Sequence, residues 1–121
     1  MKEYLFVYGT LRRRHAEIHE RFLRTERFVA EGTISGTLYD LGRYPGVHRM
    51  RGGRARTDGE LFELRDVAAT LAALDEYEGS GFRRVRVSVR LDGGRRQRAW
   101  AYLLVEAPPA HAREITSGVY R

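Results

Sequence analysis

The chain has 121 residues, which predicts a single domain over residues 1–121, and its 42% hydrophobic and 31% charged residues exclude a disordered tail and a membrane protein. The absence of cysteine excludes disulfides, thiolate metal sites and a cysteine nucleophile. Basic residues outnumber acidic ones, 22 against 16, and Lys2 is the only lysine, so arginine carries the positive charge.

The N-terminal segment is short and strongly apolar. Residues Tyr4 to Tyr8 are apolar or aromatic and precede Gly9, a pattern that predicts a strand buried on both faces. This run is far too short for the hydrophobic region of a signal peptide or for a membrane span. We therefore expect a soluble, cytoplasmic protein with no membrane partner.

The next segment predicts a helix and a curved strand. From His15 to Glu26 apolar residues occur at helical spacing, which indicates a short amphipathic helix. Residues Gly32 to Leu41 alternate with a period of two and contain glycines where a bend or a close backbone approach is expected, so they predict one strand of a curved sheet. Gly42 to Gly46 and Gly52-Gly53 are typical of turns and loops.

A second helix is predicted in the middle of the chain. Gly59 to Leu64 is a strand candidate, and Asp66 is placed to cap a helix that runs from Val67 to about Tyr77. Gly79 and Gly81 are expected to end this helix.

The clearest strand signal is a hairpin near the C-terminus. Apolar residues alternate with polar ones from Arg84 to Leu91, and a return strand from Arg98 to Val105 follows the turn Asp92-Gly93-Gly94. The tail after Pro108-Pro109 has no strong periodicity. This order of elements, with connections too short for regular βαβ crossovers, predicts an α+β fold in which a few helices flank a small, curved sheet that can close into a barrel.

Glu78 occupies an unusual position in the second helix. A rotation of about 100° per residue places it on the face of Leu71 and Leu74, whereas Glu76 falls on the opposite, solvent face. Two interpretations are open. Either the helix has frayed by Glu78 and the carboxylate lies in water, or desolvation at the rim of the core raises its pKa and lets it exchange protons near neutral pH. Spacing does not decide between them.

The end of the first strand is a second candidate feature. A glycine turn after a buried strand, as in Tyr8-Gly9-Thr10-Leu11, can point backbone N–H groups outward to hold an anion or a carbonyl oxygen. Many strands end in such a turn without binding anything, so the turn alone is a weak signal.

Four motifs that follow one another along the chain resemble a known family. They are Val7 to Arg12, then Leu38-Tyr39-Asp40 with Tyr44-Pro45, then Gly59 to Phe62, and finally Leu74 to Gly79 with Phe82-Arg83-Arg84. Together they resemble the γ-glutamylcyclotransferase-like family, in particular its compact γ-glutamylamine cyclotransferases. The resemblance covers essentially the whole chain, and the Tyr-Gly-Thr-Leu loop paired with Leu-Asp-x-x-Glu-Gly is more specific than either half alone.

The resemblance implies a small mixed barrel with flanking helices and an enzyme of the lyase or acyltransferase class. In the family the Tyr-Gly-Thr-Leu loop binds the γ-glutamyl group, and the matching residues in this chain are Tyr8, Gly9, Thr10 and Leu11. The catalytic glutamate of the family matches Glu78. The implied reaction converts a small-molecule γ-glutamyl amide into 5-oxoproline and a free amine. It requires no cofactor and no metal.

The resemblance also implies that a tyrosine contacts the substrate, and the sequence departs from the family pattern at two places. Tyr44 is expected to contact substrate, and Tyr102 is a further pocket candidate, although core packing is the commoner role of such tyrosines. Phe82 stands where many members have a tyrosine, so any role of that hydroxyl is absent. The tail from Ile115 to Arg121 matches the closing Ser-Gly-Asp-Trp of the family only loosely.

Alternatives to this enzyme remain open. Arginines cluster at positions 12–14, 49–56 and 95–98, but no nucleic-acid-binding motif accompanies them and a genome-wide arginine bias explains them as readily, so we do not expect a nucleic-acid partner. A ligand-binding relative of the same fold without catalysis is another alternative. His15 and His19 lack the His-Glu-x-x-His order, so we expect no metal site. The sequence does not indicate the amine half of the substrate or the oligomeric state.

Overall fold

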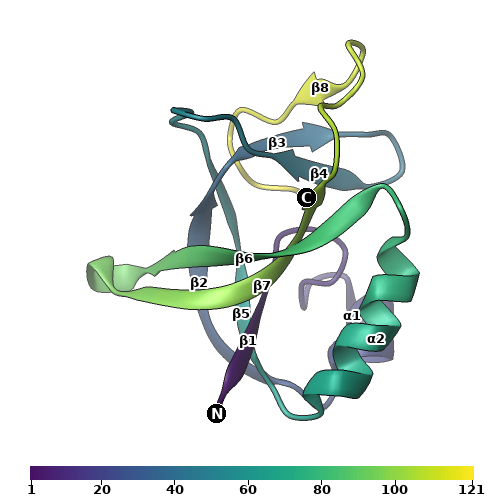
Figure 1. The fold of residues 1–121 in the computed structure, drawn as a ribbon, viewed down its shortest axis with the longest axis vertical. Coiled ribbons are helices and arrows are strands. Elements are labelled where there is room, and N and C mark those ends of the chain that lie inside the picture. Colours follow the sequence, from purple (N-terminus) through teal and green to yellow (C-terminus); the bar gives the residue numbers. More distant parts are fainter.

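The computed structural model describes residues 1–121 as a closed five-stranded barrel with a small second sheet and two helices (Figure 1). A parallel pairing between Leu5 and Trp100 closes the barrel, and the other pairings are antiparallel. The prediction of an α+β fold with a mixed, closed sheet is therefore confirmed. The barrel order is β1 (Glu3–Val7), β5 (Arg56–Leu64), β2 (Arg27–Ser35), β6 (Phe82–Leu91) and β7 (Arg96–Leu104).

Strand β1 lies between two hydrophobic cores. Phe6 and Tyr8 belong to the core inside the barrel, whereas Leu5 and Val7 belong to the core between the barrel and the helices. All four side chains are buried, with at most 7% of their surface exposed. The predicted burial of this strand on both faces is confirmed, and the end of β1 is held firmly from both sides.

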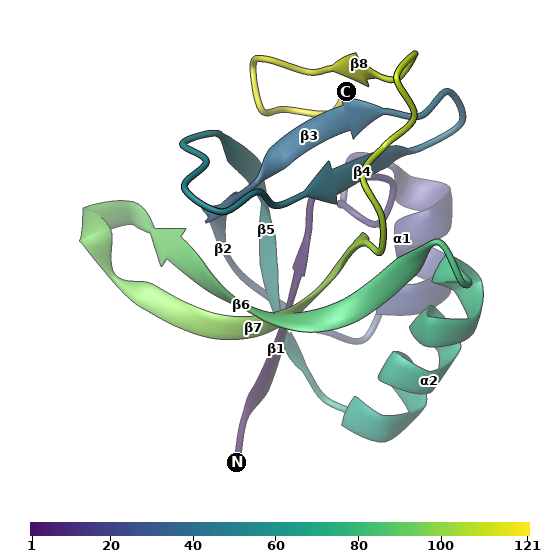
Figure 2. The ribbon, with the colours of Figure 1, turned by 45° about the horizontal axis from the view of Figure 1, so that its top comes forward.

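The two helices, α1 (Ala16–Leu23) and α2 (Val67–Glu78), cover the same side of the barrel (Figures 1 and 2). Both were predicted, and the Asp66 carboxylate caps α2 by accepting a hydrogen bond from the Ala69 amide at 3.4 Å. Helix α2 continues through Glu78 before Gly79 ends it. Neither helix has the length and apolar character that a membrane crossing needs.

The prediction of one strand from Gly32 to Leu41 is wrong, because the chain changes sheets within this range. Strand β2 ends at Ser35, and after Gly36 the chain continues as β3 (Thr37–Asp40) of the second sheet. Gly36 has a φ of 146°, and a Cβ atom there would lie 2.5 Å from Cγ1 of Val47, so a larger residue would be strained at this crossing. Period-two alternation continues across the break and does not reveal it.

The second sheet has the order β4 (Pro45–His48), β3 and β8 (Arg113–Glu114), and it lies over one end of the barrel (Figure 2). The predicted turn from Gly42 to Gly46 is too long, because Pro45 already pairs with Asp40 as the first residue of β4. Strand β4 lies at the edge of its sheet, where a proline without an N–H group is tolerated.

The predicted C-terminal hairpin is confirmed, with β6 and β7 joined by a short 3₁₀ turn, η1 (Asp92–Gly94). The tail beyond it is also ordered by hydrogen bonds, although its sequence has no periodicity. The Ile115 amide donates to the Leu38 carbonyl at 2.8 Å, and the Asp58 amide donates to the Gly118 carbonyl at 2.8 Å. The tail thus connects the second sheet to the barrel.

Candidate active site

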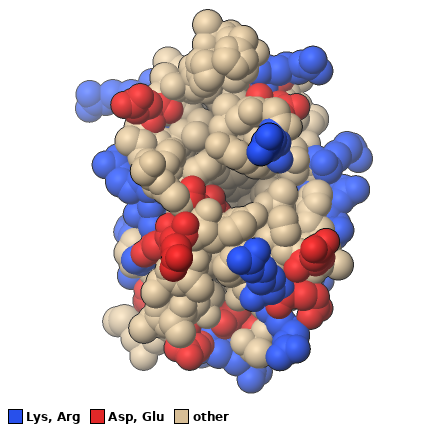
Figure 3. Space-filling model, turned by 90° about the vertical axis from the view of Figure 1, so that its right-hand side faces the viewer, with Lys and Arg blue, Asp and Glu red and all other residues tan.

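A pocket of about 270 Å³ opens between β1, the β3–β4 turn and the end of α2. Figure 3 shows a hollow with largely uncharged walls on this side of the molecule, with charged side chains around it. The six residues predicted as catalytic or substrate-binding all lie in this one pocket. Its lining residues are Phe6, Val7, Tyr8, Gly9, Thr10, Leu11, Tyr44, Pro45, Tyr77, Glu78, Phe82 and Tyr102.

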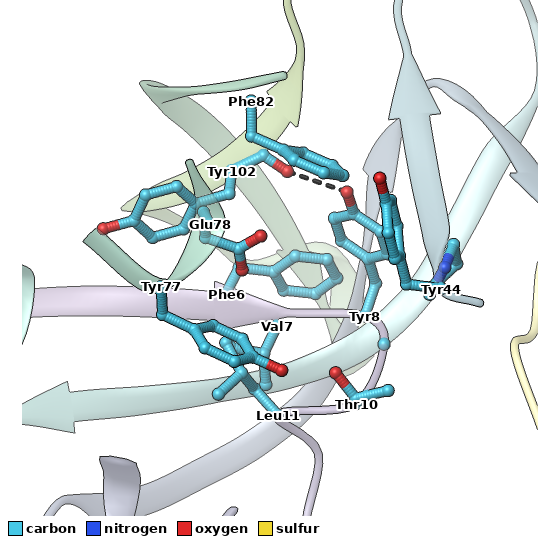
Figure 4. A pocket seen from close by; sticks show the side chains of 12 residues that line it. Phe6, Val7, Tyr8, Thr10, Leu11, Tyr44, Tyr77, Glu78, Phe82 and Tyr102 are labelled. Atoms are coloured by element: carbon cyan, nitrogen blue, oxygen red, sulfur yellow. Dashed lines mark hydrogen bonds between the residues drawn. The ribbon is translucent and has the colours of Figure 1, made fainter. Parts of the chain in front are cut away.

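Glu78 is placed in the pocket by the periodicity of α2. Leu71 and Leu74 on the same face of the helix are buried in the core, and the helix is still regular at Glu78. Figure 4 shows its carboxylate pointing into the pocket among the rings of Phe6 and Tyr8. The interpretation in which the helix has frayed by Glu78 is therefore wrong, whereas Glu76 is exposed as expected.

The Glu78 carboxylate has no hydrogen bond or ion pair with any other residue. Burial without a nearby cation raises its pKa to about 7 from an ordinary value of 4.5. A carboxylate with this pKa can both accept and donate a proton near neutral pH. Glu78 is therefore suited to general acid–base chemistry.

The loop after β1 presents free backbone donors beside Glu78. The amide N–H groups of Gly9, Thr10 and Leu11 make no hydrogen bond within the protein, and all three residues line the pocket. A Cβ atom on Gly9 would lie 2.7 Å from Cγ of Pro45, so the loop can approach β4 this closely only with glycine. Three successive free N–H groups can hold a carboxylate or a developing oxyanion.

The Tyr8 hydroxyl connects the barrel to the second sheet. It donates a hydrogen bond to the Tyr102 carbonyl at 2.7 Å and accepts one from the Val47 amide at 3.2 Å. Burial raises the pKa of Tyr8, so its hydroxyl stays protonated. The Tyr8 hydroxyl therefore holds β7 and β4 together at the pocket, and both of its hydrogen bonds are made to the protein backbone.

Tyr102, a candidate from the sequence, lines the pocket but directs its hydroxyl to Asp75. This hydroxyl donates to Asp75 Oδ1 at 2.6 Å, and Arg84 binds both oxygens of the same carboxylate at 2.9 and 3.1 Å. Hydrogen bonds from Arg84 and then from Tyr102 lower the pKa of Asp75. Asp75 is thus a fixed anion that lies one helical turn before Glu78.

Aromatic side chains form the rim of the pocket. Tyr44 is 48% exposed and lies 5.8 Å from Phe82 between ring centroids, whereas Tyr77 is 39% exposed and lies 4.6 Å from Phe22. Phe82 occupies its pocket position without a hydroxyl. Tyr77 was not predicted, because an aromatic residue on a helix is usually explained by packing.

The histidines and the tail lie outside the pocket lining. His19 donates from Nδ1 to the Leu11 carbonyl at 2.9 Å, and His15 stacks on Tyr120 with ring centroids 5.7 Å apart. No three His, Asp or Glu side chains are grouped in a way that could hold a metal ion. The tail residues Ile115 and Tyr120 instead pack against the core of the barrel.

Comparison with known proteins gives one family. The sequence profile of gamma-glutamyl cyclotransferase, AIG2-like, matches residues 5–121. A Vibrio cholerae protein is 32% identical over 114 residues, which cover 93% of this chain and 90% of that protein. A Methanocaldococcus jannaschii protein is 31% identical over 110 residues, which cover 87% of each chain. Both relatives are provisionally named gamma-glutamylcyclotransferases.

Solved structures show the same fold. The crystal structure of YkqA from Bacillus subtilis matches with a TM-score of 0.78 at 26% sequence identity. The match covers 99% of this chain and 40% of YkqA, so this chain spans less than half the length of that protein.

Proposed function

The chain belongs to the AIG2-like gamma-glutamyl cyclotransferase family, and on this premise we propose that it converts a γ-glutamyl amide into 5-oxoproline and a free amine. One observation carries the proposal. Glu78, with a pKa of about 7 and no partner inside the protein, shares a pocket with three free amide N–H groups. Such a pocket combines a proton carrier with donors for an anionic substrate group.

The proposed reaction is an intramolecular aminolysis. Glu78 accepts a proton from the α-ammonium group of the substrate, because an ammonium nitrogen has no lone pair for attack. The α-amine then attacks the γ-carbonyl carbon and closes a five-membered lactam. As the original γ-amide bond breaks, the α-nitrogen gives up its second proton and Glu78 passes both protons in turn to the leaving nitrogen, which departs as an ammonium group, so one carboxylate serves both steps. No water is consumed.

The loop from Gly9 to Leu11 has a positioning role in this proposal. Ring closure requires the extended glutamyl chain to fold until the α-nitrogen reaches the γ-carbon. Backbone N–H groups that hold one end of the chain would reduce the entropy lost in that step. In this proposal the amine half of the substrate contacts Tyr44 and Tyr77, which lie exposed at the rim of the pocket.

The proposal is tested by incubating the protein with a panel of γ-glutamyl compounds. The panel contains γ-glutamyl amino acids, a γ-glutamylated lysine and glutathione, and the products are identified by mass spectrometry. We expect 5-oxoproline and the free amine from at least one compound. The N-acetylated form of that compound should be inert, because its nitrogen cannot attack.

Two results would contradict the proposal. Release of glutamate in place of 5-oxoproline would indicate hydrolysis. Binding of γ-glutamyl compounds without turnover of any would indicate a ligand-binding relative of the same fold.

A further inference from the structure

Arg12 differs from its arginine neighbours because it is buried. Only 8% of its surface is exposed, whereas Arg13 and Arg14 are exposed as expected of a charged run. Its Nε donates a hydrogen bond to the Gly9 carbonyl at 3.3 Å, and its buried Nη2 has no partner. Arg12 is therefore not part of the solvated arginine surface that Arg13 and Arg14 belong to.

Ion pairing does not explain why Arg12 is buried. No carboxylate oxygen lies within 4.0 Å of its guanidinium, and the neighbouring Glu60 is bound by Arg13 at 3.2 Å. Burial lowers the pKa of Arg12, and the carboxylates of Glu60 and Asp58, which lie beyond ion-pair distance, offset this effect only in part. A buried, incompletely bonded guanidinium costs stability, and an apolar side chain of similar size would cost less. Its contribution must therefore be sought outside stability.

The contact with Gly9 fixes the orientation of one peptide unit of the pocket loop. The Gly9 carbonyl accepts from the Arg12 amide at 3.1 Å as well as from the guanidinium. In a trans peptide the N–H group points away from the carbonyl, so the Thr10 N–H points away from Arg12. Gly9 and Thr10 line the pocket and Arg12 does not, so the guanidinium contacts this peptide from outside the pocket lining.

We infer that Arg12 is a positioning residue that holds the Gly9–Thr10 peptide with its N–H toward the α-carboxylate of the γ-glutamyl half. This inference rests on the proposed function. No Lys, Arg or His lines the pocket, so the charge that balances a bound carboxylate must act from behind its wall. A guanidinium bound to the carbonyl polarises the peptide and strengthens its N–H as a donor. The carboxylate is charged throughout the reaction, so it suits a permanently charged arginine.

The test compares two ligands that differ only at this group. 5-Oxoproline carries the carboxylate, whereas 5-oxoprolinamide has a neutral amide in its place. We expect Arg12→Met to weaken binding of 5-oxoproline at least about tenfold and to change binding of 5-oxoprolinamide less than about twofold, as measured by calorimetry. Arg12→Gln keeps an N–H donor but no charge, so its affinity for 5-oxoproline should lie between that of the wild type and that of Arg12→Met. Arg14→Met, in the same loop, is the matched control and should bind both ligands as the wild type does.

Kinetics and stability separate this role from a purely structural one. We expect Arg12→Met to raise KM with little change in kcat, and to leave the melting temperature unchanged or higher. The inference would be overturned if Arg12→Met bound both ligands more weakly by the same factor, or if it bound both as tightly as the wild type does. A lower kcat at unchanged KM would also overturn it, since the loop would then serve the oxyanion. If Arg12→Met does not fold, Arg12→Gln provides the same comparison.

The inference and the proposed function can fail separately. If the wild type releases 5-oxoproline but binding does not depend on Arg12, only the inference fails. If the wild type releases no 5-oxoproline from any compound, the proposed function fails, and the ligand comparison still decides whether Arg12 supports carboxylate binding.

Discussion

Asp75 and Glu78 lie one turn apart on α2, yet their surroundings shift their proton affinities in opposite directions. Asp75 is paired with Arg84 and Tyr102, and its pKa is lowered. Glu78 faces a pocket without any cation, and its pKa is raised to about 7. The difference shows that the partners supplied by β6 and β7, more than the helix, decide which carboxylate is a fixed charge and which can transfer a proton.

The largest expected effect comes from removing the proton carrier. We expect Glu78→Gln to lower kcat by about 10²–10⁴-fold, because the amide keeps the shape of the side chain but cannot carry a proton. The measurement is the rate of 5-oxoproline release. Glu76→Gln, on the exposed face of the same helix, should retain the wild-type rate. A Glu78→Gln variant as fast as the wild type would remove Glu78 from the mechanism.

The next effect is the pH dependence of the reaction. Protonated Glu78 cannot accept a proton, so kcat/KM should fall about tenfold for each pH unit below about pH 7. Asp75→Asn should keep this midpoint, because Asp75 is already ionised well below that pH. A profile that is flat from pH 5 to 8 in the wild type would contradict the assignment of Glu78.

The two carboxylates should also differ in their effect on stability. Folded Glu78 keeps its proton between its ordinary pKa of 4.5 and about 7, so the wild type loses stability as the pH rises through this range. We expect Glu78→Gln to be more stable than the wild type above pH 7, by up to about 3 kcal/mol, and equally stable below pH 4.

Urea unfolding at pH 4 and pH 8 measures this difference. At pH 8 Asp75→Asn should instead be less stable than the wild type, because the lowered pKa of Asp75 stabilises the fold at any pH above its ordinary pKa of 3.8, and this benefit is lost only below that pH as folded Asp75 is protonated. The same sign in both variants would show that the environments do not differ as described.

The smallest effect is expected where the fixed charge is paired. Arg84 and Asp75 have side chains that are 28% and 45% exposed, so solvent and salt screen their attraction. We expect Arg84→Met to cost less than about 1 kcal/mol of unfolding free energy and to change turnover little. Arg90→Met, an exposed arginine of the same strand, is the control. A loss of turnover as large as that of Glu78→Gln would mean that the two carboxylates act together.

Much of the fold follows from local patterns in the sequence. Helical spacing placed Glu78 with Leu71 and Leu74, and alternation located both strands of the C-terminal hairpin. These signals are local, because each element repeats its own period. The resemblance to a family then brought the loop after Tyr8 and the end of α2 into one site.

Long-range features could not be predicted in this way. Gly36 lies in an unbroken alternating pattern, so only the close approach of Val47 from another strand shows why the chain changes sheets there. Arg12 belongs to a run of three arginines, and nothing in that run distinguishes the buried one. The pairing of Asp75 with Arg84 and Tyr102 likewise depends on strands that meet only in the folded barrel.

The change of sheet at Gly36 divides the pocket between two parts of the fold. The barrel and α2 carry Glu78 and the Gly9 loop, whereas the β3–β4 turn of the second sheet carries Tyr44. A turn between two strands accepts substitutions and changes of length more readily than a closed barrel does. Under the proposed function, substitutions in this turn should therefore alter which amine the pocket accepts, while Glu78 and the Gly9 loop stay unchanged.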